Sequence, residues 1–475
     1  MKTRLITLTL IFTSVINAQD ITGQWNGLLK IQGTQLRVVF NISKTDSEYS
    51  STMDSPDQGA KGIPVTLTTF ENSTLKIEIS NAKIVYVGIL DKENNFIGDF
   101  KQAGQSFPMN LYREKIEKEK ITRPQEPIKP YPYYSEKIKF ENTTDKITLA
   151  GTLTLPEPPH PEGTEGRRDA NYPVVVLITG SGPQNRDEEL LGHKPFLVLA
   201  DYLTKNGIGV LRFDDRGTGE STGDFKTATS LDFASDVESA VNYLLTRKEI
   251  NKKKLGLIGH SEGGIIAPIV AAKSKGINFV VLLAGTGIMG NELLLLQQEL
   301  IGKASGANNE ELQKAKKINK GAFDIIIKSS NSEILKTELT NYIQQTIKDI
   351  PESERPSGMS EKDFVNQQVN QLSSPWMQFF IKYDPSIILK EVKCAVLALN
   401  GSKDLQVPST INLETIKKGL EKGGNKKVTI KELPNLNHLF QECQTGTPQE
   451  YSKIEQTFSP LALTTILNWI VLQTK

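Results

Sequence analysis

A serine between two glycines is the first group in this chain whose type and spacing could do chemistry. Residues 259–263 read GHSEG, a G-x-S-x-G pentapeptide that follows the short apolar run LGLI and precedes a segment with helical spacing. In that setting the glycines allow a turn so sharp that the serine side chain is pushed out over the edge of a sheet. Ser261 is therefore a candidate nucleophile, although an ordinary glycine-rich turn has a similar sequence.

A serine hydroxyl needs a base to take its proton, and histidine commonly serves. The chain has four histidines, at positions 160, 193, 260 and 438. His160 lies in a loop rich in proline and glycine, His193 precedes a helical segment, and His260 is next to Ser261 with its side chain expected to point elsewhere. His438 follows the alternating segment KVTIKELPN, so it is expected just after the end of a strand. His438 is the candidate base.

A third group must hold the imidazole in one tautomer, and a carboxylate can do so. Asp404 lies in the loop after the strand-like segment CAVLALNG, between the serine and the histidine in chain order. Serine, then acid, then histidine is the order that accompanies a G-x-S-x-G turn. Asp214 and Asp215 also end a strand-like segment, but they precede the serine. Glu432 is a weaker rival to Asp404.

Attack on a carbonyl group also needs backbone N–H donors for the oxyanion that forms. The residue after the nucleophile supplies one donor, the amide of Glu262, and the loop after residues 173–179 supplies the other. That loop reads GSGPQNRD, and its glycines let the backbone approach a ligand closely. We predict the amide of Gly182, with Ser181 as the alternative. A phosphate-binding loop is excluded because the G-K-[ST] ending is missing.

The elements that must position these residues are apolar strands alternating with helices. The strand-like segments include PVVVLIT, IGVLRF, LGLIG, NFVVLLAG and CAVLALNG, and helical spacing recurs between several of them. Strands that are apolar on both faces predict a mainly parallel sheet with helices on both faces. We therefore predict an α/β core in two parts, residues 136–285 and 394–475.

Residues 286–393 interrupt this alternation with a helical block. Apolar residues recur there at helical spacing, as at Leu335, Leu339 and Ile343, and SEKDF at 360–364 has the pattern of a helix start. Such a block is either a lid over a site or padding. We predict a lid, because the insertion leaves from the strand ends at which open α/β sheets bind ligands.

The chain ahead of the core has three parts. Lys2 and Arg4 precede a short apolar run over about residues 5 to 16, and Ile16 and Ala18 stand at the positions that a signal peptidase recognises. This predicts a cleavable signal peptide over residues 1–18 and a secreted or periplasmic protein. The run is too short for the alternative, a transmembrane anchor, so no membrane span is expected in the mature protein. Residues 19–113 alternate with period two and predict a small all-β domain. Residues 114–135, charged and then rich in proline, predict an extended linker that does not pack.

Composition narrows the classes of partner. The net charge is +1, so no basic surface for nucleic acid or anionic lipid is indicated, and a small neutral partner fits better. The histidines lie far apart and the cysteines lack the spacing of metal ligands, so neither a metal nor a cofactor is expected. The two cysteines, Cys394 and Cys443, are expected to be unbridged.

From about residue 136 onward the chain resembles the α/β-hydrolase superfamily. The segments that carry the resemblance are GSGPQNRD, FDDRGTGEST (213–222), GHSEGG, LNGSKDLQVP and NLNHLF. They are most similar to secreted bacterial esterases related to the serine aminopeptidase and prolyl oligopeptidase groups, one branch of which also has a small β domain. The resemblance implies the α/β-hydrolase fold and a catalytic triad of Ser261, Asp404 and His438, and it makes residues 215–217 a turn motif.

Three functions fit these features. The favoured one is a carboxylesterase that cleaves small or medium acyl esters through an acyl-enzyme on Ser261. An exopeptidase, aminopeptidase or dipeptidyl peptidase-like, could use the same triad on short peptides, with Glu292, Glu299 or Asp324 holding the peptide's amino terminus. The β domain is too small for the propeller that prolyl oligopeptidase relatives use to admit peptides. A third possibility is a binding protein in which the hydrolase core is secondary.

Overall fold

The computed structural model describes residues 20–31, 34–46, 48–58, 60–102, 105–117, 123–156, 171–349 and 360–475. The predicted signal peptide, residues 1–18, and His160 lie outside these ranges. The chain divides into two compact units, one holding most of the residues before 120 and the other most of those after. Each unit is described by itself.

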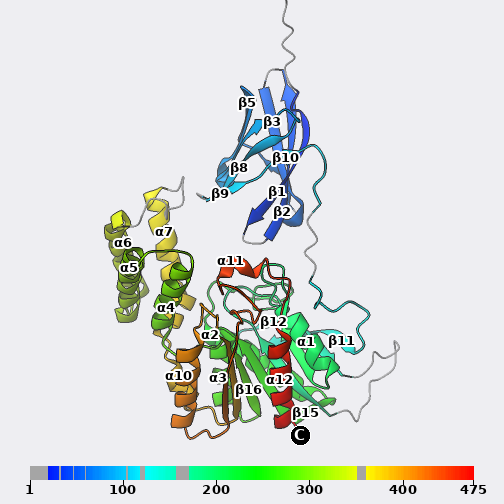
Figure 1. Ribbon diagram of the computed structural model, residues 1–475, viewed down its shortest axis with the longest axis vertical. Helices are drawn as coiled ribbons and strands as arrows, with labels where there is room; N and C mark the ends of the chain where they lie inside the picture. The colour runs from blue at the N-terminus through cyan, green and yellow to red at the C-terminus, as the bar shows by residue number, and fades with distance from the viewer. Residues whose placement is uncertain are drawn as a thin grey trace, which may run out of the picture. The chain divides into compact units, whose positions relative to one another are not determined.

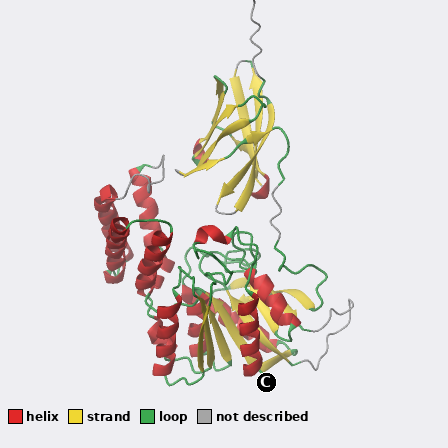
Figure 2. Cartoon of the chain, in the orientation of Figure 1, coloured by secondary structure: helices red, strands yellow, loops and turns green. Residues whose placement is uncertain are grey.

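The first unit is an all-β domain (Figures 1 and 2). Two antiparallel meanders, β2 to β4 and β5 to β9, are joined through β1 and β10 into a sheet of order β4-β3-β2-β1-β10-β8-β7-β6-β5, with β9 beside β8. The strands are β1 (Gly23–Ile31), β2 (Thr34–Thr45), β3 (Glu48–Ser55), β4 (Ala60–Pro64), β5 (Leu67–Glu71), β6 (Thr74–Ile79), β7 (Ile84–Leu90), β8 (Phe96–Gln102), β9 (Gln105–Pro108) and β10 (Leu111–Tyr112).

Alternation of side chains along these strands builds the core of the β unit. Val38, Phe40 and Ile42 of β2 and Leu75 and Ile77 of β6 are all buried in one cluster, as the period-two pattern predicts. The sheet also bends back on itself. Ser51 of β3 and Thr68 of β5 belong to strands near opposite ends of the strand order, yet their hydroxyl groups share a hydrogen bond of 2.7 Å. The predicted all-β character of this part of the chain is therefore confirmed.

The second unit contains an eight-stranded sheet of order β11-β12-β14-β13-β15-β16-β17-β18. Neighbouring strands pair in parallel from β14 through β13 to β18, whereas β11 and β12 add an antiparallel edge. The strands are β11 (Tyr134–Asn142), β12 (Ile147–Leu155), β13 (Tyr172–Ile178), β14 (Gly209–Phe213), β15 (Ile250–His260), β16 (Phe279–Leu283), β17 (Ala395–Gly401) and β18 (Val428–Leu433). Because parallel strands point the same way, the loops after β13, β15, β16, β17 and β18 leave from one edge.

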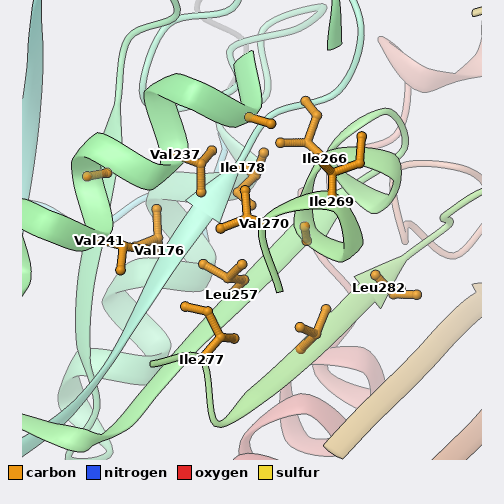
Figure 3. Close-up of a cluster of buried hydrophobic side chains, with 14 of the residues drawn as sticks. Val176, Ile178, Val237, Val241, Leu257, Ile266, Ile269, Val270, Ile277 and Leu282 are labelled. Carbon is orange, nitrogen blue, oxygen red and sulfur yellow. The ribbon is translucent and has the colours of Figure 1, made fainter. Parts of the chain in front are cut away.

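Helices cover both faces of this sheet, and β13 shows why. Val174 and Val176 face one hydrophobic cluster, shared with α2, α3 and α10, while Val175 and Leu177 face another, shared with α1 and α12. Figure 3 shows side chains of the first cluster interleaved between strands and helices. The helices are α1 (Pro195–Lys205), α2 (Ser230–Thr246), α3 (Gly263–Lys273), α10 (Ser409–Lys422), α11 (Pro448–Tyr451) and α12 (Pro460–Gln473).

The insertion between β16 and β17 is helical, as predicted. Its helices are α4 (Gly290–Ala304), α5 (Asn309–Lys328), α6 (Ser332–Thr346), α7 (Glu361–Leu372), α8 (Pro375–Lys382) and α9 (Pro385–Leu389). Leu335, Leu339 and Ile343 are buried in a cluster that the insertion forms largely from its own side chains. Ser360 caps α7 by accepting a hydrogen bond from the amide of Asp363, as the sequence pattern indicates.

The stretch expected to be an unpacked linker differs from that expectation in its second half. The Arg123 guanidinium donates to the carbonyl groups of Gly192, Ser452 and Ile454, and Arg123 is only 9% exposed. The Gln125 side chain bonds three backbone groups at positions 457 and 458. Proline-rich composition predicts an extended chain, but it does not reveal polar side chains that fit the carbonyl groups of distant loops.

Two further features bear on the sequence predictions. In the described part of the chain, no helix combines the length and apolarity required to cross a membrane. Cys394 and Cys443 are both free thiols, and burial raises the pKa of each to about 11. The expectation that they are unbridged is confirmed.

Candidate active site

The strand-to-helix turn around Ser261 is held by very close backbone packing. β15 ends at His260 and α3 begins at Gly263, and between them Ser261 adopts a φ of +52°, in the left-handed region that side chains rarely occupy. A Cβ on Gly259 would lie 2.0 Å from the carbonyl oxygen of Gly263, and one on Gly263 would lie 2.2 Å from that of Ile178. Only glycine fits both positions. The turn leaves the partly exposed Ser261 in a strained conformation, as is common at functional sites.

His438 and Asp404 lie together at the carboxyl edge of the sheet. His438 Nδ1 is 2.8 Å from Oδ2 of Asp404, and both residues are buried. The other oxygen of Asp404 accepts the amides of Gln406 and Val407 at 2.8 and 2.9 Å. The carboxylate is thereby fixed in place, and it directs the Nδ1 proton toward itself so that Nε2 is free to accept one.

The neighbours of Ser261 bring the nucleophile to the same edge. His260 Nε2 lies 2.9 Å from the carbonyl oxygen of His438, and the two imidazole rings are 4.9 Å apart. A Cβ on Gly180, in the loop after β13, would lie 3.3 Å from the Cβ of Ser261. Three chain segments that are far apart in sequence therefore meet around the serine.

The loop after β13 also presents backbone donors. The amide of Gly180 donates to Glu188 Oε1 at 2.7 Å and is therefore occupied. The amides of Ser181, Gly182 and Glu262 donate to no other group among the described residues. Gly182 has a φ of +99°, which suits glycine and excludes most other residues. These amides are available to a ligand, and the oxyanion role of Gly182 and Glu262 stays a prediction.

The carboxylates rejected on chain order have other structural partners. The Arg186 guanidinium contacts both oxygens of Asp214, and the pKa of Asp214 is held below its usual value. Asp215 accepts the Thr179 hydroxyl at 2.8 Å, and burial raises its pKa well above the ordinary range. Glu432, the weaker rival, accepts a hydrogen bond from the Ser409 hydroxyl. Asp214 and Asp215 shape the loop after β13, and none of these bonds is to the candidate base.

The Glu262 side chain makes a contact that sequence reasoning missed. Its Oε1 accepts the Ser230 hydroxyl at 2.6 Å and the indole N–H of Trp376 at 2.8 Å. Burial raises the pKa of Glu262, which is only 4% exposed. Trp376 belongs to α8 of the insertion, so the insertion is bonded to the residue that follows the nucleophile. A pattern among neighbouring residues of the sequence cannot indicate this contact, because Glu262 and Trp376 are 114 positions apart.

A pocket of about 490 Å³ lies beside the Asp404 loop. Its lining combines apolar and polar side chains, and the Gln406 amide donates to the Tyr451 hydroxyl at 3.2 Å. The lining residues are Leu190, Leu191, Gln406, Pro448, Gln449, Tyr451, Ser452 and Lys453. A pocket of this size and polarity suits a small apolar group.

The remaining described histidine is structural. His193 is 1% exposed, with ring nitrogens 3.0 Å from the Thr457 hydroxyl and 2.9 Å from the carbonyl oxygen of Tyr451. Burial lowers its pKa to about 4. Among the described residues, no three His, Cys, Asp or Glu side chains are grouped so as to hold a metal ion.

Comparison with known proteins adds an independent line of observation. Residues 236–443, which include Ser261, Asp404 and His438, match the family model "BAAT / Acyl-CoA thioester hydrolase C terminal". Esterase EstD of Thermotoga maritima is 26% identical over 325 residues, covering 68% of this chain and 66% of that protein. The chain belongs to the α/β-hydrolase superfamily. These matches support a hydrolase.

Other known proteins match over shorter stretches or at lower identity. The uncharacterized protein YfhR of Escherichia coli O157:H7 is 37% identical over 155 residues, which cover 32% of this chain and 48% of YfhR. The matches thus span less than two thirds of the length of these relatives. The solved structure of the Pyrococcus furiosus esterase Pf2001 has 14% identity and a TM-score of 0.42, covering 76% of this chain and 100% of that one.

Proposed function

We propose that this protein is a serine carboxylesterase with Ser261 as nucleophile, His438 as base and Asp404 as the acid that orients it. The observation that carries the proposal is the 2.8 Å contact between His438 and Asp404 at the same sheet edge as a serine held at a φ of +52°. A turn this strained costs free energy, and it persists when the surrounding structure enforces it.

The proposed reaction proceeds in two halves. Ser261 Oγ attacks the ester carbonyl carbon while His438 Nε2 takes the hydroxyl proton, and the amides of Gly182 and Glu262 bind the resulting oxyanion. The intermediate collapses, the alcohol leaves with the proton from His438, and the acyl group stays on Ser261. A water molecule then attacks the acyl-enzyme, His438 takes its proton, and the carboxylic acid leaves as the proton returns to Ser261.

An ester substrate is better supported than a peptide. Of the insertion carboxylates considered for binding a peptide's amino terminus, Glu299 lies 2.8 Å from Lys316 and Asp324 lies 2.7 Å from Lys320, all on the surface. The pocket beside Gln406 instead offers the apolar surface of Leu190, Leu191 and Pro448 to a small or medium hydrocarbon group of an ester.

The helical insertion is proposed to act as a lid that is fixed to the candidate site through its helices α4 and α8. Trp376 of α8 donates to Glu262, and Gln297 of α4 lies 3.4 Å from Gln406 in the Asp404 loop. These contacts join the insertion to two loops of the candidate site, which supports a role in admitting substrate. Export to the periplasm or the medium is also proposed, and N-terminal sequencing of the mature protein should then begin at Gln19.

The decisive experiment compares matched substrates. The purified protein and its Ser261→Ala variant are given a short-chain nitrophenyl ester and an aminoacyl or dipeptidyl nitroanilide. Ester cleavage that is lost in Ser261→Ala supports the esterase, and faster nitroanilide cleavage identifies an exopeptidase instead. No turnover of either substrate, with no labelling of Ser261 by a fluorophosphonate, overturns both and favours a binding protein.

A further inference from the structure

A second buried pair of histidine and carboxylate lies next to the candidate triad. His260 Nδ1 is 2.9 Å from Glu188 Oε1, and the two residues are 7% and 4% exposed. His260 precedes the nucleophile, and Glu188 comes from the loop after β13. The reaction proposed above uses neither side chain, so their burial there requires another explanation.

The hydrogen-bond partners of His260 determine its protonation. Nε2 faces the carbonyl oxygen of His438 at 2.9 Å, and a carbonyl oxygen can only accept, so Nε2 carries a proton. Nδ1 faces Glu188 Oε1, which also accepts the amide of Gly180 at 2.7 Å. Two donors directed at one oxygen favour the ionised carboxylate, which accepts from the ring as well. An imidazole that donates from both nitrogens is a cation. His260 and Glu188 thus form a buried ion pair.

This pair joins the three segments that carry the chemistry. Glu188 holds the amide of Gly180 at the start of the oxyanion loop, His260 is covalently next to Ser261, and the His260 ring holds the backbone of His438. A Cβ on Gly180 would lie only 3.5 Å from His260 Nδ1, so the three segments are in close contact at this point. Loss of either proton on the His260 ring breaks one of these links.

We propose that Glu188 and His260 are positioning residues that clamp the oxyanion loop, the nucleophile turn and the base loop together, and that loss of a His260 proton at alkaline pH releases the clamp and lowers kcat. The kinetic part rests on the proposed esterase function. The proton assignment does not depend on it.

The surrounding charges favour the cation. Burial disfavours a charged His260, but the Glu188 charge, the bonds to Glu188 and to the His438 carbonyl, and the nearby Asp404 outweigh it and raise the pKa of His260 above its ordinary value. Asp215 and Glu262, the other buried acids near this site, have raised pKa values chiefly because of burial. A raised pKa favours the neutral form of those two acids, so Glu188, which contacts the ring directly, is the counter-ion. Because the His260 pKa is raised, the clamp is intact at neutral pH and is lost as the pH rises.

The proton assignment is tested by NMR of the protein labelled with ¹⁵N-histidine. Near neutral pH the wild type should show a doubly protonated imidazole whose signal is missing from His260→Gln. A wild-type spectrum in which His260 is a neutral imidazole overturns the ion pair, whatever the catalytic activity of the protein.

The positioning role is tested by kinetics on a short-chain nitrophenyl ester. Glu188→Gln removes the counter-ion but keeps an oxygen for the Gly180 amide, so kcat should fall roughly tenfold to a hundredfold with KM within about twofold, and the alkaline loss of kcat should move to lower pH. Glu189→Gln, the adjacent exposed residue, is the matched control and should behave as wild type.

Two results would overturn this role. A Glu188→Gln variant with wild-type kcat across the pH range excludes the clamp, and so does a uniform loss of kcat without any change in the pH profile, since that indicates a merely structural contact. If the wild type turns over no ester, the proposed function fails and the NMR result alone decides the ion pair.

Discussion

Replacing Asp404 by asparagine tests the candidate triad closely, because the structure dictates which way the new amide must face. One oxygen of Asp404 accepts two backbone amides, from Gln406 and Val407, at 2.8 and 2.9 Å, and the other lies 2.8 Å from His438 Nδ1. A carboxamide has a single oxygen. Two backbone donors outweigh one ring donor, so the oxygen should stay with the amides and the NH₂ group should face the imidazole.

That orientation inverts the tautomer of the base. An NH₂ group that donates to Nδ1 of His438 requires the ring proton to sit on Nε2, which then cannot take the proton of Ser261. In Ser-His-Asp triads this exchange lowers kcat about 10⁴-fold while leaving the geometry intact. At 1.36 kcal/mol for each factor of ten, the loss corresponds to about 5.4 kcal/mol of transition-state stabilisation.

The assay is kcat on a short-chain nitrophenyl ester at neutral pH, with thermal unfolding followed for each variant. Asp404→Asn should remain folded and lose about four orders of magnitude in kcat. Glu432→Gln is the matched control, because it alters the rival carboxylate, which bonds Ser409, and should keep near-wild-type kcat. A folded Asp404→Asn variant with kcat within about tenfold of wild type would refute the reasoning.

Three other measurements follow from the same structure. Ser261→Ala should lower kcat by roughly 10³-fold or more without unfolding the protein, and wild-type turnover would contradict the nucleophile assignment. Trp376→Phe keeps an aromatic ring but removes the N–H that bonds buried Glu262, so denaturant unfolding should show a loss of about 1–3 kcal/mol; an unchanged midpoint would mean that the bond is absent. Burial lowers the pKa of His193 to about 4, so its share of stability is present above about pH 6.5 and is lost as the pH falls toward 4, by about 3 kcal/mol. Urea unfolding near neutral and near acid pH should show this loss in the wild type, and a loss of the same size in His193→Gln would exclude His193 as its source.

The sequence alone determined the parts of this protein that depend on local spacing. The space around Gly259 and Gly263 does not admit a side chain, so the pentapeptide sequence by itself indicates the sharp turn at Ser261. Apolar runs and period-two alternation report which faces of a strand are buried, as with Val175 and Val176 on opposite faces of β13. Chain order selected Asp404 over Asp214, and the structure puts Asp404 beside His438.

Only the tertiary structure decided which polar side chains pair across the fold. Glu188 bonds His260 across 72 positions, Trp376 bonds Glu262 across 114, and Arg123 bonds loops more than 300 residues further on. A local pattern records whether a side chain is apolar and which face it occupies, but it does not record its distant neighbours. A buried polar group must find partners wherever the packed chain places them, because leaving it unpaired costs free energy. Those partners depend on how the loops meet at one edge of the sheet, which is a property of the whole fold.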